Sequence, residues 1–260
     1  MRRYTKTLGL FWSVSVAAEM EYRANFVLSC LTTLLTLGGA LFTVGLLFQN
    51  GHTPGGYSWP AALTVLGVYT LLDGLQQSVL SPNRTALTEH VREGTLDFVL
   101  LKPIDTQFWM SLRRFSPWGL TDVAAGLGLL GYAGWRLGLS PVDALRGGLA
   151  VALGSVILYA VGFALATLTI WFVKLYNITI AMAALLEAGR YPIQAYPAVY
   201  RAFFTAVLPV AFMTSVPAAA LRGEAGAAWL AGLAAVAAGS LVVSCLFWRF
   251  ALRFYTSASS

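Results

Sequence analysis

Two acidic residues lie inside long apolar stretches of this chain, where ionisable groups are rare. Asp73 lies in one such stretch, with Gln76 and Gln77 one helical turn further on, and Asp122 lies in another. A carboxylate at the centre of a membrane-spanning helix costs roughly 2.5–3.5 kcal/mol, so it is expected to face protein, water or a partner. These four side chains could therefore line a vestibule for a polar or cationic solute.

The two acids also have a simpler structural interpretation. Each lies toward the end of its stretch that the basic connection containing Arg113 and Arg114 approaches. Pairing with these arginines, or with neighbouring helix ends, would fix the bundle without any contact to a solute. The residues alone favour this pairing over the vestibule.

Motifs for ATP binding, hydrolysis and metal binding are missing from the chain. Lys6, Lys102 and Lys174 follow Thr, Leu and Val, so none completes a Gly-Lys-Ser/Thr phosphate-binding loop. His52 and His90 are predicted on opposite sides of a membrane, and neither H-E-x-x-H nor G-x-S-x-G occurs. We therefore expect no catalytic residue, no metal site and no bound cofactor.

The composition is that of a membrane protein. Hydrophobic residues make up 58% of the chain and charged residues 11%, with a mean hydropathy of +0.70. A water-facing domain carries about 25% charged residues. The net charge of +6 could suit nucleic acid, but the basic residues lie in short loops and at the ends of apolar stretches. Orientation and anionic lipid headgroups account for them there, so we expect lipids and no nucleic acid as partners.

Six apolar stretches approach the roughly 20 residues that a helix needs to cross a bilayer. Helices are expected because backbone groups in lipid must be satisfied within their own segment. The sequence thus predicts an all-α polytopic protein with a single transmembrane domain over 1–260. The predicted spans are about 24–48, 59–80, 115–135, 147–173, 199–220 and 226–247.

The basic residues predict the orientation of these spans. With a cytoplasmic N-terminus, all of the 17 lysines and arginines fall on the inner side except Arg136, Arg146 and Arg222. Lys and Arg resist translocation in short loops, so both termini are predicted to be cytoplasmic. The longest polar connection, 81–114, is then on the inside.

A separate interfacial helix is predicted before the first span, over 4–22. Leu8 and Phe11 can share one apolar face with Trp12 beside it, as in helices that lie in the membrane interface. The alternative is an extension of the first span, which Glu19 and the charges after it disfavour.

The connection 81–105 is predicted to form two short helices joined by a tight turn. A helix that opens after Pro82 should end at Gly94, which suits a left-handed terminator. Thr95 can cap a second short helix, which Pro103 stops. The product is a compact element, too short to have its own core.

This connection contains the pattern V-R-x-G-x-L-D-x-x-L-x-x-P. Its positions are Val91, Arg92, Gly94, Leu96, Asp97, Leu100 and Pro103. The pattern resembles the cytoplasmic coupling loop of permeases of the type-two ABC exporter family. A second, weaker resemblance to that subfamily is in Gly189-Arg190-Tyr191-Pro192, Tyr196-Pro197, Leu208–Phe212 and Pro217-Ala218.

The resemblance implies a function and partners. Two such permeases, identical or related, form a pathway in the bacterial cytoplasmic membrane, and two separate ATPase subunits that carry ATP and Mg²⁺ grip their inner loops. The chain would then be no enzyme by itself. The residues implied in ATPase coupling are Glu89, Arg92, Glu93, Gly94, Leu96, Asp97 and Pro103. Two alternatives remain: 81–105 is only a well-capped connector, or the chain is a self-contained secondary transporter or channel.

Three further features give testable expectations. The apolar outer segment 209–226 contains Pro209 and Pro217 and is interpreted either as broken helices of an outer gate or as the late end of the fifth span. Glu187 and Arg190 have the spacing of a local helix-surface pair. Small residues at four-residue spacing support close helix packing in a bundle; they include Ala231, Ala235 and Gly239, and also Ala124 and Gly128.

Overall fold

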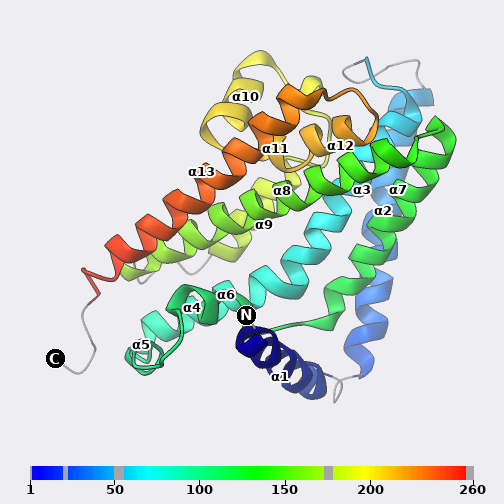
Figure 1. Cartoon of the computed structure of the whole chain (residues 1–260). Coiled ribbons are helices and arrows are strands. Elements are labelled where there is room, and N and C mark those ends of the chain that lie inside the picture. Colours follow the sequence, from blue (N-terminus) through cyan, green and yellow to red (C-terminus); the bar gives the residue numbers. More distant parts are fainter. Residues whose placement is uncertain (1, 20–22, 50–55, 173–177, 256–260) are drawn as a thin grey trace.

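The predicted all-α class is confirmed by the fold. The computed structural model describes residues 2–19, 23–49, 56–172 and 178–255, and in these ranges it contains helices and no strand. The longer helices are α1 (Arg2–Glu19), α2 (Arg23–Gln49), α3 (Trp59–Leu75), α7 (Leu120–Leu137), α8 (Pro141–Thr167) and α13 (Ala227–Ala251) (Figure 1).

Shorter helical segments connect them. Those between α3 and α7 are η2 (Gln76–Leu80), α4 (Ser81–Arg92), α5 (Asp97–Leu100), α6 (Thr106–Leu112) and η3 (Pro117–Gly119). Those between α8 and α13 are η4 (Leu168–Ile170), α9 (Ile178–Glu187), η5 (Ile193–Ala195), α10 (Ala198–Ala202), η6 (Phe203–Val207), α11 (Val210–Met213) and α12 (Ser215–Leu221). We call the end of the bundle with α1, α4, α5 and α6 the lower end, and the end with the start of α3 and the α7–α8 connection the upper end (Figure 1).

Several helices are long and apolar enough to cross a membrane. In the described part of the chain these are Ala24–Leu46, Pro141–Ile170 and Ala227–Ala251, with a fourth if the bent pair Ala198–Thr205 and Val210–Leu221 is one span. A bilayer requires apolar helices of this length. The chain is therefore a multi-pass membrane protein.

Local signals fix where α7 and α8 end and begin. Gly138 ends α7 in the left-handed region at φ +64°. Ser140 and Asp143 then form a capping box, in which the Asp143 N–H donates to Ser140 Oγ at 3.2 Å and the Ser140 N–H donates to Asp143 Oδ2 at 3.4 Å. With Pro141 in its first turn, α8 starts six residues before the predicted 147.

Two glycines bring α3 and α7 into backbone contact. A Cβ on Gly126 would lie 2.5 Å from the Leu71 backbone nitrogen, and a Cβ on Gly74 would lie 2.5 Å from the Val123 nitrogen. No side chain fits at either position without a shift of the backbone. These two helices accordingly make the most extensive helix–helix contact in the described chain.

The small-residue repeats expected to mediate packing lie elsewhere. Ala231, Ala235 and Gly239 are exposed on α13, and Ala124 and Gly128 are exposed on α7. The helical bundle that these repeats supported is present, but within the single chain these residues do not form its close helix contacts. Spacing alone could not distinguish the packed glycines from the exposed ones.

We expect Gly126→Ala to destabilise the protein and Gly128→Ala to leave it intact. The first adds a methyl group against the α3 backbone, and overpacking of this kind costs about 1–3 kcal/mol. The second adds one where nothing lies within 4 Å, and it gains up to about 1 kcal/mol of helix propensity. Thermal unfolding of the two variants in one detergent measures the difference. Equal unfolding temperatures would contradict the α3–α7 contact.

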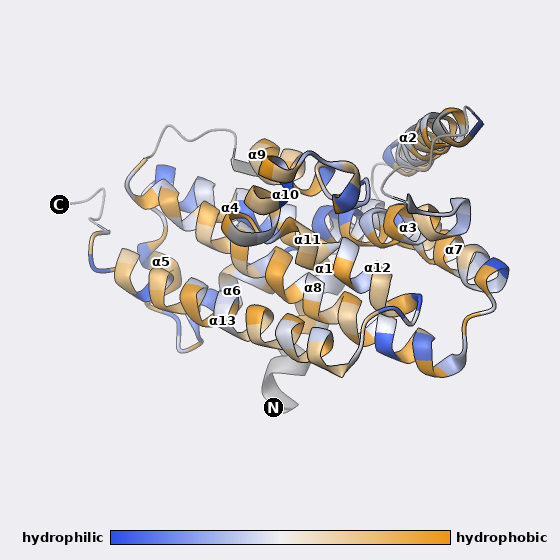
Figure 2. Cartoon of the chain, turned by 90° about the horizontal axis from the view of Figure 1, so that it is seen from above, coloured by the Kyte–Doolittle hydropathy of each residue, from blue (hydrophilic) through white to orange (hydrophobic). Residues whose placement is uncertain are grey.

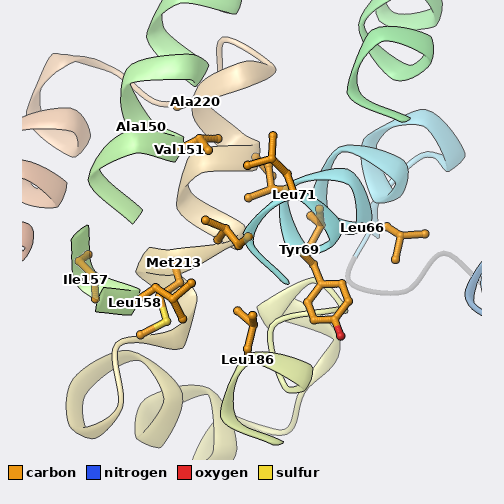
Figure 3. Close-up of a cluster of buried hydrophobic side chains, with 14 of the residues drawn as sticks. Leu66, Tyr69, Leu71, Ala150, Val151, Ile157, Leu158, Leu186, Met213 and Ala220 are labelled. Carbon is orange, nitrogen blue, oxygen red and sulfur yellow. The ribbon is translucent and has the colours of Figure 1, made fainter. Parts of the chain in front are cut away.

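The main core lies between α3, α8, α9 and the short helices α11 and α12 (Figure 3). Leu158 of α8, Leu186 of α9 and Met213 of α11 are buried there. Tyr69 of α3 lies at the edge of this cluster, and its hydroxyl points toward α9 (Figure 3). The core therefore fixes α9 against α3, where polar residues begin.

In contrast, α2 stands apart from the other helices when the molecule is seen from above (Figure 2). Most of its apolar side chains are exposed, including Leu34, Leu35 and Phe42. Its polar contacts are with the start of α7 and the η3 turn before it. The Ser29 hydroxyl donates to the Trp118 carbonyl at 2.9 Å, and the Thr33 and Thr121 hydroxyls lie 3.0 Å apart.

The N-terminal helix is separate from the first span, as expected for an interfacial helix. It ends at Glu19, and the last predicted positions, 20–22, lie outside the described residues. The Trp12 indole N–H donates to the Leu112 carbonyl at 3.0 Å, and its ring stacks on Phe115 at 4.7 Å. These contacts hold α1 against the lower end of the bundle.

The predicted fifth span, 199–220, is not a single helix. The structure divides it into α10, η6, α11 and α12, and the two halves are bent by 68°. Leu208 between them is extended, with φ −115° and ψ 110°. Pro209 explains the break, because a proline disfavours helical backbone in the residue before it.

The chain also reaches the upper end earlier than expected. Tyr57, just before α3, donates its hydroxyl hydrogen to Gln194 Oε1 at 2.9 Å. The described part of the predicted inner connection 174–201 begins at Ile178, and through α9 and η5 it reaches the upper end. Hydropathy missed this crossing because Glu187 and Arg190 interrupt the apolar run.

Candidate functional site

A polar cavity of about 610 Å³ lies between α2, α3, the start of α7 and α9. It brings together all four polar residues that the sequence singled out; these are Asp73, Gln76, Gln77 and Asp122. We call it the α2–α3–α9 cavity. Because Asp73 and Asp122 come from different helices, only the packing of α3 on α7 makes them neighbours.

One amide group connects the two acids. The Gln77 side-chain nitrogen donates to Asp73 Oδ2 at 2.9 Å and to Asp122 Oδ2 at 3.1 Å. The pairing with Arg113 or Arg114 that the sequence favoured is not what the structure shows. Arg114 instead pairs with Glu89 at 3.2 Å, and the Arg113 guanidinium lies 5.2 Å from the Trp109 ring centre. The acids therefore face the cavity.

A second polar cluster in this cavity joins α3 to the end of α9. Arg190 Nη1 lies 2.7 Å from Glu187 Oε1, which is the local pair that the spacing predicted. The Tyr69 hydroxyl donates to Glu187 Oε2 at 2.7 Å, and the Arg190 guanidinium lies 4.9 Å from the Tyr69 ring centre. Sequence reasoning missed Tyr69 because its partners lie more than a hundred residues away.

Hydroxyl side chains of α2 complete the wall of the cavity. Ser29, Thr32, Thr33 and Thr36 all line it. Their spacing of three, four and seven residues places them on one helix face. This spacing was visible in the sequence, within an otherwise apolar span, and it could have indicated the polar wall.

The two glutamines lie in an unusual backbone segment. Gln76 and Gln77 begin η2, a π-helical turn over Gln76–Leu80 that continues α3 into α4 without a break. Single π-helical turns are rare and frequently occur at functional sites. One continuous helical path, Trp59–Arg92, therefore connects the cavity to the connection 81–105, which we call the coupling loop.

The turn in the coupling loop has the predicted glycine geometry. Gly94 has φ +67°, the Gly94 N–H donates to the Val91 carbonyl at 3.3 Å, and the Thr95 N–H donates to the His90 carbonyl at 2.9 Å. These two bonds define a Schellman terminator for α4. Thr95 does not cap α5 as expected, because its hydroxyl bonds His90 Nδ1 at 2.7 Å. Burial and the nearby Arg113 lower the pKa of His90.

One side of the coupling loop is anchored in the bundle. Leu87, Leu96 and Val99 are buried in a second apolar cluster with Phe163 of α8 and Trp248 of α13. The coupling loop is too short to form a core of its own, so its apolar side chains pack against the long helices. Leu96, one of the residues assigned to ATPase coupling, therefore holds the loop to the bundle.

The other side of the loop is exposed. It carries most of the remaining residues that the resemblance assigned to coupling: Glu89, Arg92, Glu93 and Pro103, with Gly94 and Asp97 half-buried beside them. Sequence reasoning missed two apolar side chains on this side: Phe98 is 69% exposed and Leu101 81% exposed. Their spacing of three residues was the available signal. We call Phe98 and Leu101 the docking pair.

A buried arginine lies where the loop meets α8. Arg84 is 4% exposed, and its guanidinium nitrogens have no hydrogen-bond partner among the described residues. Burial lowers the pKa of Arg84 to about 10, so it remains charged at neutral pH. Gly162 makes room for it, because a Cβ there would lie 2.7 Å from Arg84 Nη1.

We expect Arg84→Met to stabilise the protein. Replacing buried ionic groups by apolar side chains of similar volume raises the free energy of unfolding by about 1–4 kcal/mol in favourable cases. The control is Arg114→Met, which removes an exposed ion pair worth about 1 kcal/mol or less. Chemical or thermal unfolding in detergent ranks the three proteins. A less stable Arg84→Met variant would show that the guanidinium has a stabilising partner.

The two prolines of the expected outer gate lie at the upper part of the bundle. Pro209 is the N-cap residue of α11 and follows the extended residue Leu208, and Pro217 is buried in α12 close to Gly154 of α8. The segment is thus formed of short, broken helices rather than the end of one straight span, and its role as an outer gate stays a prediction. Arg222 secures the end of this segment, since its Nη1 donates to the Thr64 hydroxyl at 2.8 Å.

Comparison with known proteins identifies the family. No curated protein and no solved structure matches the chain. Residues 34–259 match the family model described as ABC-2 family transporter protein, which covers most of the chain. Permeases of this family are the membrane components of ABC transporters, generally partner with an ATPase subunit, and are generally not catalytic themselves. The chain belongs to the ABC-2 transporter family.

Proposed function

We propose that this chain is the membrane-spanning half of an ATP-driven exporter. It forms the translocation pathway with a second permease, identical or related, and two copies of a separate ATPase that binds ATP and Mg²⁺ drive it. The coupling loop transmits the motion of the ATPase to the spans.

The docking pair is the observation that carries this proposal. Phe98 and Leu101 are exposed on a polar element that, in this topology, lies outside the membrane. Exposed apolar groups rimmed by polar residues mark interaction sites, and Glu89, Arg92 and Glu93 form such a rim here. The pair is small and accessible, as the anchor point of a partner protein should be.

The attachment of the loop supports its role in transmission. Leu87, Leu96 and Val99 fix it to the lower parts of α8 and α13, and α4 continues through η2 into α3. A push on the loop therefore acts directly on three long helices. The π-helical turn, whose first two residues line the cavity, places a hinge where α3 joins α4, because such a turn interrupts the regular hydrogen-bond ladder.

The distribution of basic residues supports a cytoplasmic lower end, with both termini inside. The bacterial inner membrane is the location that the resemblance of the coupling loop implies. In the structure Arg190 lines the cavity, and α10, which contains Arg201, lies toward the upper end. The excess of basic residues at the lower end is therefore smaller than the sequence predicted, but it remains. The outward direction of transport is supported by the resemblance of the coupling loop to those of exporters.

The position of the cavity supports a pathway between two permeases. The cavity lies at the margin of the single chain, beside α2, whose apolar side chains are mostly exposed. A second permease against this margin would close the cavity and bury those side chains. The alternative is a self-contained secondary transporter. It needs no second chain, so it would not explain why the cavity lies at the margin of the single chain.

The test is reconstitution with an ABC-type ATPase that co-purifies with the tagged permease. The tagged permease and that ATPase are co-expressed, the mass of the complex is measured by native mass spectrometry, and solute movement is followed in proteoliposomes. We expect two permeases with two ATPase subunits, and movement only with hydrolysable ATP. Vectorial transport by the permease alone, driven by a proton or sodium gradient, would overturn the proposal.

A further inference from the structure

We infer that the α2–α3–α9 cavity binds a protonated amine, that is, an ammonium group with N–H donors attached to an apolar body. The role of this ligand as the transported substrate rests on the proposed function. The binding site itself follows from the acceptors and the charges that line the cavity.

The Gln77 amide occupies the position that such an ammonium would take. Two carboxylate oxygens, from Asp73 and Asp122, approach its nitrogen at 2.9 and 3.1 Å. An ammonium presents the same N–H donors with a full positive charge, and charge-assisted hydrogen bonds are about twice as strong as neutral ones. Gln77 is exposed to the cavity, so its side chain can turn away when a ligand enters.

A buried acceptor in the lining of the same cavity has no partner within the described part of the chain. Gln76 is 3% exposed and lines the same cavity, and its Oε1 has no hydrogen-bond partner among the described residues. A buried unsatisfied acceptor costs about 1–3 kcal/mol, so such groups call for a donor. Gln76 follows Asp73 by one helical turn, on the same face of α3. This third acceptor favours a ligand with N–H groups, which a quaternary ammonium lacks.

The charge balance of the cavity also favours a cation. Asp73, Asp122 and Glu187 line it, and Arg190 is its one cationic residue in the described chain. Arg190 is already engaged by Glu187 at 2.7 Å. Asp73 and Asp122 share a neutral amide and repel one another, because like charges interact strongly at low dielectric. A bound ammonium between them would relieve that repulsion.

The rest of the cavity suits an apolar body. Leu28, Leu37 and Leu66 line it, together with Trp118. Its volume of about 610 Å³ lies in the range of roughly 300–1,000 Å³ that holds small organic ligands. The expected ligand is thus an amphiphilic amine rather than a metal ion or a polyanion.

Equilibrium binding to the permease alone, in lipid nanodiscs at pH 7, tests the site. The probe is radiolabelled hexylammonium, with unlabelled hexyltrimethylammonium and hexan-1-ol as competitors. We expect saturable binding of the probe, competition at least about tenfold weaker by the trimethyl compound, which has no N–H donors, and none by the alcohol. The double variant Asp73→Asn/Asp122→Asn should lose at least about tenfold in affinity. No saturable binding, or equal binding by that variant, would overturn the inference.

A tethered ammonium provides a second test that needs no ligand. Gln77→Lys places a lysine ammonium between the two carboxylates, and Gln77→Met is its apolar match. We expect Gln77→Lys to abolish probe binding and to unfold at a higher temperature than Gln77→Met, with the gain removed by Asp73→Asn/Asp122→Asn. Gln194→Lys, at the upper end, is the control and should bind the probe as the unmodified protein does. Probe binding retained in Gln77→Lys would contradict the site.

These assays separate the site from the proposed function. They contain no ATPase, so amine binding together with failure to form an ATPase complex would leave the site standing and reject the exporter. ATP-driven transport together with no saturable amine binding would reject the site and leave the exporter standing.

Discussion

Replacing Phe98 and Leu101 by alanine should separate the permease from its ATPase while leaving the permease folded. Burying one large apolar side chain contributes about 1.5–3 kcal/mol to association. The loss of two such contacts should weaken binding by about a hundredfold or more. Because both side chains are mostly exposed in the single chain, their removal should lower its unfolding temperature far less than it weakens ATPase binding.

The measurement is the affinity of the purified ATPase for the permease in nanodiscs, followed by ATP-driven transport in proteoliposomes. A matched control is Leu145→Ala/Trp229→Ala, which removes two exposed apolar side chains from the starts of α8 and α13, away from both the coupling loop and α2. That variant should bind the ATPase normally. If Phe98→Ala/Leu101→Ala binds as tightly as the control, the docking pair has no role and the coupling loop is only a connector.

Local signals made the coupling loop predictable. Pro82, Gly94 and Pro103 act on the backbone within a few residues of their own position, so the first helix and the turn follow from sequence alone. Gly94 has the left-handed φ that the pattern required. Thr95 was misassigned because a hydroxyl that can cap a helix can equally bond a nearby side chain, and His90 lies within reach.

The polar cavity was only half predictable. Acids inside apolar stretches indicate burial, and Asp73 and Asp122 were found for that reason. Their neighbours depend on which helices pack together, and this depends on glycine contacts such as Gly126 against Leu71. Many glycines in the chain look alike in sequence. The choice between arginine pairing and a cavity could therefore not be made without the fold.

The fifth span shows the limit of hydropathy. Averaging over about 20 residues favours one straight helix in any apolar stretch, and 199–220 is such a stretch. Pro209 disfavours helical backbone at one residue only, Leu208, and the helix breaks there. Conversely, α9 is apolar but short, with Glu187 at its end. A hydropathy average over about 20 residues around α9 also includes polar residues beside it, and these lower the mean.

Substitutions at Gly94 should reduce the transport driven by each ATP hydrolysed. The loss should be larger, the less readily the new residue adopts the left-handed backbone conformation of Gly94. The Gly94→Asn variant should keep near-normal coupling of ATP hydrolysis to transport, because asparagine adopts the left-handed region at little cost. Gly94→Ala should couple partially, since a left-handed alanine costs roughly 1–2 kcal/mol. Gly94→Pro should uncouple almost completely: proline fixes φ near −65°, opposite in sign to the observed +67°, and lacks the N–H that bonds the Val91 carbonyl.

The ratio of solute moved to ATP hydrolysed in proteoliposomes separates coupling from assembly. The docking pair lies beyond the turn, so Gly94→Pro still presents it, but on an element no longer held rigidly to α4. ATP hydrolysis should therefore continue while transport falls, at least about tenfold below the Gly94→Asn variant. Amine binding to the cavity should be unchanged, because η2 and α3 precede the turn. Normal transport per ATP in Gly94→Pro would show that the turn transmits no motion, and the force would then have to reach α3 by another route.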